Sequence, residues 1–66
     1  SSAEAELATA VAAQGKAAAD LARTEPLLAI DAVSRQEVDA YRTALRQALA
    51  NVTAAQAHVE SARTNQ

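Results

Sequence analysis

Apolar residues in the second half of the chain recur at alternating intervals of three and four residues. These residues are Val38, Tyr41, Leu45, Ala48, Val52, Ala55, Val59 and Ala62. The alternation averages 3.5 residues, which is the heptad period that places one stripe of a helix against a partner in a left-handed coiled coil. The pattern predicts one long helix, over about residues 35–64.

The first half of the chain shows the same alternation and predicts a second packing stripe. Its members are Leu7, Val11, Gln14, Ala18, Leu21, Glu25 and Leu28. They predict a helix over about residues 3–29, which leaves a tip at about residues 29–34. Antiparallel pairing about that tip brings Leu21 opposite Leu45. The expected fold is therefore all-α, a two-helix antiparallel coiled-coil hairpin.

The start of the second helix is marked by a capping box at Ser34–Glu37. In this motif the Ser34 hydroxyl accepts the Glu37 backbone N–H, and the Glu37 carboxylate accepts the Ser34 N–H. Val33 and Val38 occupy the two positions of a hydrophobic staple. We therefore expect Arg35 to be the first helical residue.

The end of the first helix is disturbed by Pro26, which cannot donate to the helical ladder and would clash with the carbonyl of Ala22. We expect a break or kink near residues 23–25, followed by one further turn, from Pro26 to Leu28 or Ala29. The tip has no glycine to end that turn. Asp31 tolerates a left-handed conformation better than its neighbours, so it is the expected reversing residue.

Composition makes a lone hairpin marginal, because 20 of the 66 residues are alanine and each buries little area. Ordering the chain costs about 1–2 kcal/mol per residue, which so few large side chains barely offset. We expect the alanine faces to accept neighbouring helices, so that the chain self-associates; the alternative is that alanine only fills the helices. Gly15 is expected to make room for Leu49 across the pair, with a hinge as the alternative.

Candidate chemistry is sparse. The net charge of −2 argues against nucleic-acid binding, and the chain has no cysteine. His58 is the only histidine and has no ligands at metal-binding spacing, while Glu25 is expected to bond the Tyr41 hydroxyl. No apolar run is long enough to span a membrane. We therefore expect no enzymatic activity, no cofactor and no metal site.

Two residues near the tip are expected to face outward. Arg23 and Leu27 lie four residues apart and fall on the outer side of the first helix, where a guanidinium and an apolar side chain form a plausible docking surface. Two alternatives stay open: Leu27 folds over the tip, and Arg23 is an ordinary solvated charge. Capping alone is enough to explain Ser34.

Arg23, Leu27 and Ser34, followed by R-Q-E-V-D, resemble the Arg-Leu-Ser tip motif of periplasmic adaptor (membrane fusion) proteins of RND-type tripartite multidrug efflux pumps. The resemblance extends over nearly the whole chain. It departs from the family pattern at Thr24, where an aromatic residue is common, and in the tip, where many members carry a glycine.

The resemblance implies that the chain is part of a larger adaptor protein in the periplasm, attached to the inner membrane. Six neighbouring adaptor hairpins would assemble, and their tips would meet a TolC-type outer-membrane channel through Arg23, Leu27 and Ser34. Domains outside this chain would contact the inner-membrane RND transporter. The alternative is a structural coiled-coil spacer arm whose tip binds nothing.

Overall fold

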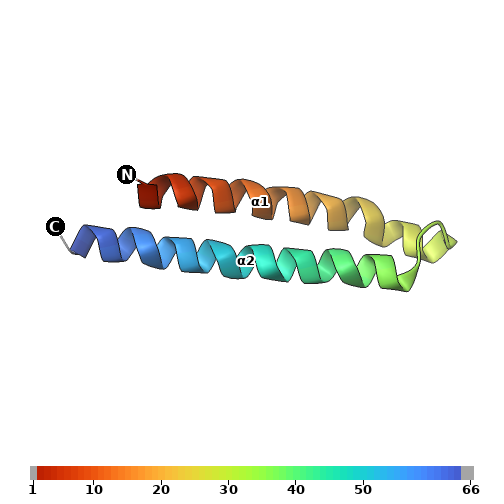
Figure 1. Cartoon of the computed structure of the whole chain (residues 1–66). Coiled ribbons are helices and arrows are strands. Elements are labelled where there is room, and N and C mark those ends of the chain that lie inside the picture. Colours follow the sequence, from red (N-terminus) through yellow and green to blue (C-terminus); the bar gives the residue numbers. More distant parts are fainter. Residues whose placement is uncertain (1, 65–66) are drawn as a thin grey trace.

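The computed structural model describes residues 2–64 and contains two long antiparallel helices (Figure 1). They are α1 (Ser2–Thr24) and α2 (Arg35–Thr64), joined by the 3₁₀ helix η1 (Glu25–Ile30). The molecule is a rod of 54 × 14 × 11 Å, with the start of α1 and the end of α2 at the same end of the rod. The all-α hairpin predicted from the heptad pattern is confirmed.

The packing stripe of α2 is the one that the sequence predicts. Val38 is fully buried and Ala48, Ala55 and Val59 are buried. The remaining four members of the stripe are half-buried: Tyr41, Leu45, Val52 and Ala62. The strict three–four alternation of larger side chains along α2 is enough to define its inner face.

The stripe predicted for α1 is wrong at two positions. Val11 is 48% exposed, and Glu25 is also exposed. Ala10 and Ala17 are half-buried and Thr24 is buried at the corresponding places. The other five predicted members are half-buried, and the observed stripe has the same heptad period: Leu7, Gln14, Ala18, Leu21 and Leu28. Ala10 replaces Val11 and Thr24 replaces Glu25 in the observed stripe, while Ala17 and Ala18 are both half-buried. Most residues of this helix are small, so side-chain size does not indicate which of two neighbours faces α2.

Thr24 ends α1 and is the one buried polar residue in the described part of the chain. Its hydroxyl donates a hydrogen bond to the backbone carbonyl of Asp20, so the buried oxygen is satisfied within its own helix. A threonine can therefore occupy a core position here without a partner from α2.

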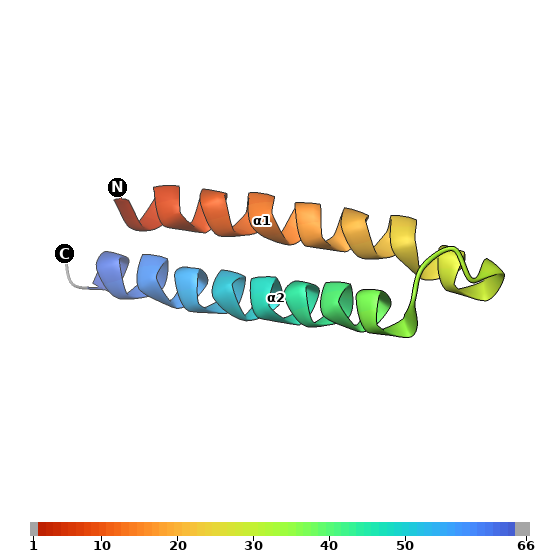
Figure 2. The ribbon, with the colours of Figure 1, turned by 45° about the vertical axis from the view of Figure 1, so that its right-hand side comes forward.

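The disturbance predicted at Pro26 takes the form of a change in helix type. The α-helix stops at Thr24, and Pro26 lies in the first turn of η1, where a missing N–H costs nothing. The 3₁₀ turn runs to Ile30, beyond the predicted Leu28 or Ala29, and Figure 2 shows the chain crossing from it to α2.

The chain reverses at Asp31, as predicted. Asp31 has φ 58° and ψ 22°, which is the left-handed conformation. Its N–H donates to the Leu28 carbonyl over 3.1 Å, and the Ala32 N–H donates to the Leu27 carbonyl over 3.0 Å. These two bonds form the Schellman motif that satisfies the last carbonyls of a helix.

The capping box is also confirmed. The Glu37 N–H donates to Ser34 Oγ, and the Ser34 N–H donates to Glu37 Oε1, each over 3.1 Å. The helix begins at Arg35. Val38 is fully buried and Val33 is half-buried, as expected of the two staple positions.

The packing role predicted for Gly15 is wrong. Gly15 is exposed, and a Cβ atom at this position would meet nothing within 4 Å. Leu49, its expected neighbour, is 46% exposed. The observed stripe of α1 rotates Gly15 away from α2, so the hairpin itself does not require a glycine there.

Replacing Gly15 with alanine is expected to stabilise the hairpin by about 0.5–1 kcal/mol, because glycine in a helix interior loses more entropy on folding than alanine does. The measurement is chemical unfolding followed by circular dichroism at one fixed chain concentration. A destabilised variant would show that Gly15 is needed for a close contact.

Replacing Asp31 with glycine is expected to stabilise the hairpin by about 0.5–1 kcal/mol, because glycine adopts the left-handed conformation without the Cβ clash. Asp31→Ala is the matched control and should destabilise the hairpin in the same unfolding measurement. Equal stabilities for the two variants would contradict the role of Asp31 as the reversing residue.

Replacing Ser34 with alanine is expected to cost about 1 kcal/mol through the lost cap. Ser34→Asp retains a capping oxygen and should keep most of that stability, as measured by thermal unfolding. If Ser34→Ala unfolds at the same temperature as the parent chain, the capping box contributes nothing.

Candidate functional site

The tip of the hairpin holds all three residues that the sequence marks as a docking surface. Arg23 lies in the last turn of α1, Leu27 lies in η1, and Ser34 immediately precedes α2. All three therefore lie at one end of the rod (Figure 2). The three residues lie on three different kinds of segment: the end of an α-helix, a 3₁₀ helix and the N-cap of a second α-helix. Local hydrogen bonds hold the backbone of each segment.

Arg23 faces outward, as predicted, but it is not the unpaired arginine that the sequence suggests. Its side chain is 65% exposed, and Nη2 lies 3.0 Å from Asp20 Oδ1. Asp20 also accepts from Lys16 Nζ over 2.8 Å. The ion pair holds the guanidinium along α1 while most of its donors stay available to a partner.

Asp20 is the shared anion of this cluster. The hydrogen bond from Lys16, followed by the one from Arg23, lowers the pKa of the Asp20 carboxyl below its ordinary value. A carboxyl whose pKa is lower in the folded chain than in the unfolded chain stabilises the folded state at pH values above its unfolded pKa. This stabilisation is lost as the pH falls through the pKa of the folded state. The cluster is therefore intact near neutral pH and is lost in acid.

Leu27 is half-buried, so it lies between the two alternatives of facing outward and folding over the tip. In a 3₁₀ helix the side chains at positions i and i+3 eclipse one another, which places Ile30 on the same side as Leu27. Ile30 is 71% exposed. The tip therefore carries a second apolar side chain, Ile30, that the heptad pattern did not single out. The sequence indicates it only through the interval of three residues between Leu27 and Ile30, which follow Pro26.

Ser34 is exposed, but its hydroxyl is already engaged in the capping box. Ser34 Oγ also lies 3.1 Å from Glu37 Oε1. A partner could bond this hydroxyl only while the hydroxyl also caps α2. The local role of Ser34 in the hairpin is therefore to start α2.

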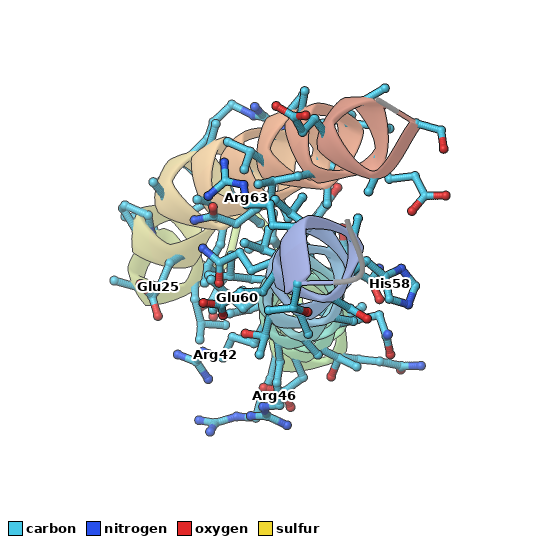
Figure 3. All side chains as sticks on the ribbon, turned by 90° about the vertical axis from the view of Figure 1, so that its left-hand side faces the viewer. Glu25, Arg42, Arg46, His58, Glu60 and Arg63 are labelled. Carbon is cyan, nitrogen blue, oxygen red and sulfur yellow. The ribbon has the colours of Figure 1, made fainter. Side chains whose placement is uncertain are left out.

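Glu25 connects the tip to α2 through an ion pair with Arg42, with 2.7 Å between Oε2 and Nη2. Arg42 also pairs with Asp39 over 3.3 Å, and the hydrogen bond to Glu25 is the main reason that the pKa of the Arg42 guanidinium is raised. The expected bond between Glu25 and Tyr41 is therefore wrong. Because Glu25 lies outside the stripe, its carboxylate reaches the exposed arginine beside Tyr41 (Figure 3).

His58 lies far from the tip, near the start of α1. Its Nδ1 atom is 3.5 Å from Glu6 Oε2. Among residues 2–64 no group of three or more His, Cys, Asp or Glu side chains is placed to hold a metal ion. Within the same range, neither long helix is apolar enough to cross a membrane. The chemistry of the described chain therefore consists of ion pairs and exposed apolar side chains.

Comparison with known proteins gives two matches that agree with this geometry. The family model described as "RND MFP, alpha-helical hairpin domain" matches residues 1–66. The membrane fusion protein MtrC of Neisseria gonorrhoeae is 58% identical over 44 residues, which cover 67% of this chain and 11% of MtrC. No solved structure matches the chain. Because the family model spans every residue and describes the fold seen here, the chain belongs to the family of alpha-helical hairpin domains of RND membrane fusion proteins.

Proposed function

We propose that this hairpin docks by its tip onto the periplasmic end of a TolC-type outer-membrane channel, as the adaptor of a tripartite drug efflux pump. Membership in the membrane fusion protein family supports the adaptor role in efflux. The proposal assigns channel contact to Arg23, Leu27 and Ser34, and it assigns no catalytic step to the chain.

The observation that carries the proposal is the exposed, rigid tip. Arg23 presents an exposed guanidinium that is oriented by Asp20, and Ile30 adds a 71% exposed apolar side chain beside Leu27. Arginine is enriched among the residues that dominate binding at protein interfaces, and an exposed apolar side chain adds area that a partner can bury. The Schellman turn and the capping box fix the backbone beneath these side chains, so little ordering entropy is lost on docking.

The wider assembly follows the same proposal. The match with MtrC covers 11% of the length of MtrC. The proposal assigns contacts with the inner-membrane RND transporter to domains other than this hairpin. Neighbouring adaptor hairpins, six in the family arrangement, would stand together so that several tips reach one channel. The proposed location is the periplasm, with the parent protein attached to the inner membrane.

Arg23→Asp in the full-length adaptor is expected to abolish drug efflux while costing the hairpin no more than about 1 kcal/mol, because the ion pair that it breaks with Asp20 is exposed. Reversing a charge in a desolvated contact costs several kcal/mol of binding, which is enough to uncouple adaptor from channel. Leu27→Ser should also reduce efflux by removing an apolar anchor. The measurement is the drug resistance of cells at matched adaptor levels.

Two controls separate docking from folding. Arg63→Asp makes the same chemical change at the opposite end of the rod and should leave docking intact. Arg23→Gln removes the charge without placing a second carboxylate beside Asp20. If cells carrying Arg23→Asp export drugs as well as the parent does, the tip is only a turn and the hairpin is a structural spacer arm.

A further inference from the structure

The 3₁₀ helix η1 is the part of the tip that packing holds least. None of its six residues is buried, and only Leu27 and Leu28 are half-buried. The helices on either side are better anchored, since Thr24 at the end of α1 and Val38 in the first turn of α2 are buried. Yet η1 carries two apolar side chains of the docking surface, Leu27 and the 71% exposed Ile30. Their direction therefore depends on what else holds η1.

Within residues 2–64 no backbone hydrogen bond joins η1 to α2. The N–H of Asp31 donates to Leu28 and that of Ala32 donates to Leu27, so both bonds stay within η1 and the turn that follows it. Pro26 has no N–H, so the joint between α1 and η1 lacks one bond that a continuous helix would have. The hydrogen-bond geometry of a 3₁₀ helix is also poorer than that of an α-helix. Fixing the angle between η1 and α2 is therefore left to side chains.

Glu25 and Arg42 make such a contact. Glu25 is the first residue of η1, and its Oε2 accepts from Arg42 Nη2 over 2.7 Å, in the one side-chain hydrogen bond between η1 and α2 in the described part of the chain. Arg42 Nη1 lies 3.3 Å from Asp39 Oδ1, so the same guanidinium is also held from its own helix. Figure 3 shows Glu25 and Arg42 on the same side of the helix pair. A charge-assisted bond of this kind is shorter and stronger than a neutral one.

A small tilt of η1 would displace its apolar side chains. A 3₁₀ helix rises about 2 Å per residue, so Ile30, five residues after Glu25, lies about 10 Å along η1 from the ion pair. Over that length a tilt of about 10° moves Ile30 by about 2 Å. Binding sites require their side chains to be held within about 0.5 Å of the productive geometry. The angle of η1 therefore decides whether the docking surface is correctly formed.

We propose that Glu25 and Arg42 are positioning residues for docking: their ion pair fixes the angle of η1 to α2, so that Leu27 and Ile30 face the channel in one direction. The inference rests on the proposed docking function and extends it to two residues that act through η1. The side chains of Glu25 and Arg42 are 49% and 45% exposed, and exposed ion pairs add little to stability because water screens them. Loss of the pair is therefore expected to impair docking and to leave the hairpin folded.

The angle of η1 can be measured without a channel. Nitroxide spin labels at Ala29→Cys and Ala50→Cys, exposed positions of η1 and α2 in a chain without cysteine, report the distance between the two elements by double electron–electron resonance. One narrow distance distribution is expected while the ion pair is intact. Arg42→Glu should broaden it, because the introduced carboxylate repels Glu25. A distribution that Arg42→Glu leaves unchanged overturns the proposal.

Two matched variants show whether the effect belongs to the ion pair. Glu25→Arg/Arg42→Glu brings opposite charges together again with their signs exchanged, so the narrow distribution should return. Arg46→Glu makes the same chemical change one turn further along α2. Within residues 2–64 Arg46 has no ion-pair partner, so this variant should behave like the parent chain. A double variant as broad as Arg42→Glu, or equal broadening by Arg46→Glu, contradicts the positioning role.

Drug efflux by the full-length adaptor, at matched adaptor levels, tests the consequence for docking. Arg42→Glu is expected to lose most of the parent's drug resistance, the double variant to regain it and Arg46→Glu to keep it, while circular dichroism finds all three equally helical. If Arg42→Glu exports normally and Arg23→Asp does not, the docking function stands and the positioning role is wrong. If both export normally, the docking function itself is wrong, and the positioning role with it.

Discussion

The register between α1 and α2 is the constraint on which the rest of the structure depends. Alanines occupy much of the interface, and one alanine packs much like the next, so these contacts distinguish only weakly between one register and another. Contacts outside the interface therefore help to fix the register. The Schellman turn at Asp31 and the capping box at Ser34 do this at the tip, and the ion pair of Glu25 with Arg42 holds the alignment across it.

The same fixed turn serves the proposed contact with a channel. A tip built from a 3₁₀ turn and two caps has few soft backbone dihedrals, because its N–H groups donate to nearby carbonyls and side chains. The side chains of Arg23 and Ile30 can then stay exposed without a flexible loop beneath them. Within residues 2–64 only Asp31 has a positive φ, so the conformational cost of this rigid tip is concentrated at one position.

Much of the fold could be predicted from the sequence, because local signals agreed with the long-range pattern. Three signals were clear because few other interpretations of their residues were available. They are the three–four spacing of α2, the capping box at Ser34 and the reversal at Asp31. The stripe of α1 could not be predicted as well, because Ala10, Val11, Ala17 and Ala18 offer two equivalent ways to continue a heptad. That ambiguity led to the errors at Gly15 and Glu25.

The candidate site shows the same limit. The pair of Asp20 and Arg23 was readable from its interval of three residues on a helix, whereas the pair of Glu25 and Arg42 required the rotation of α1 to be known. That rotation also decides which side chains are left over. By turning Val11 and Gly15 away from α2, it exposes an apolar surface next to Leu49 on a rod with few buried side chains. In the hairpin alone, large apolar side chains are therefore left exposed at two places, beside Leu49 and at Ile30 in the tip.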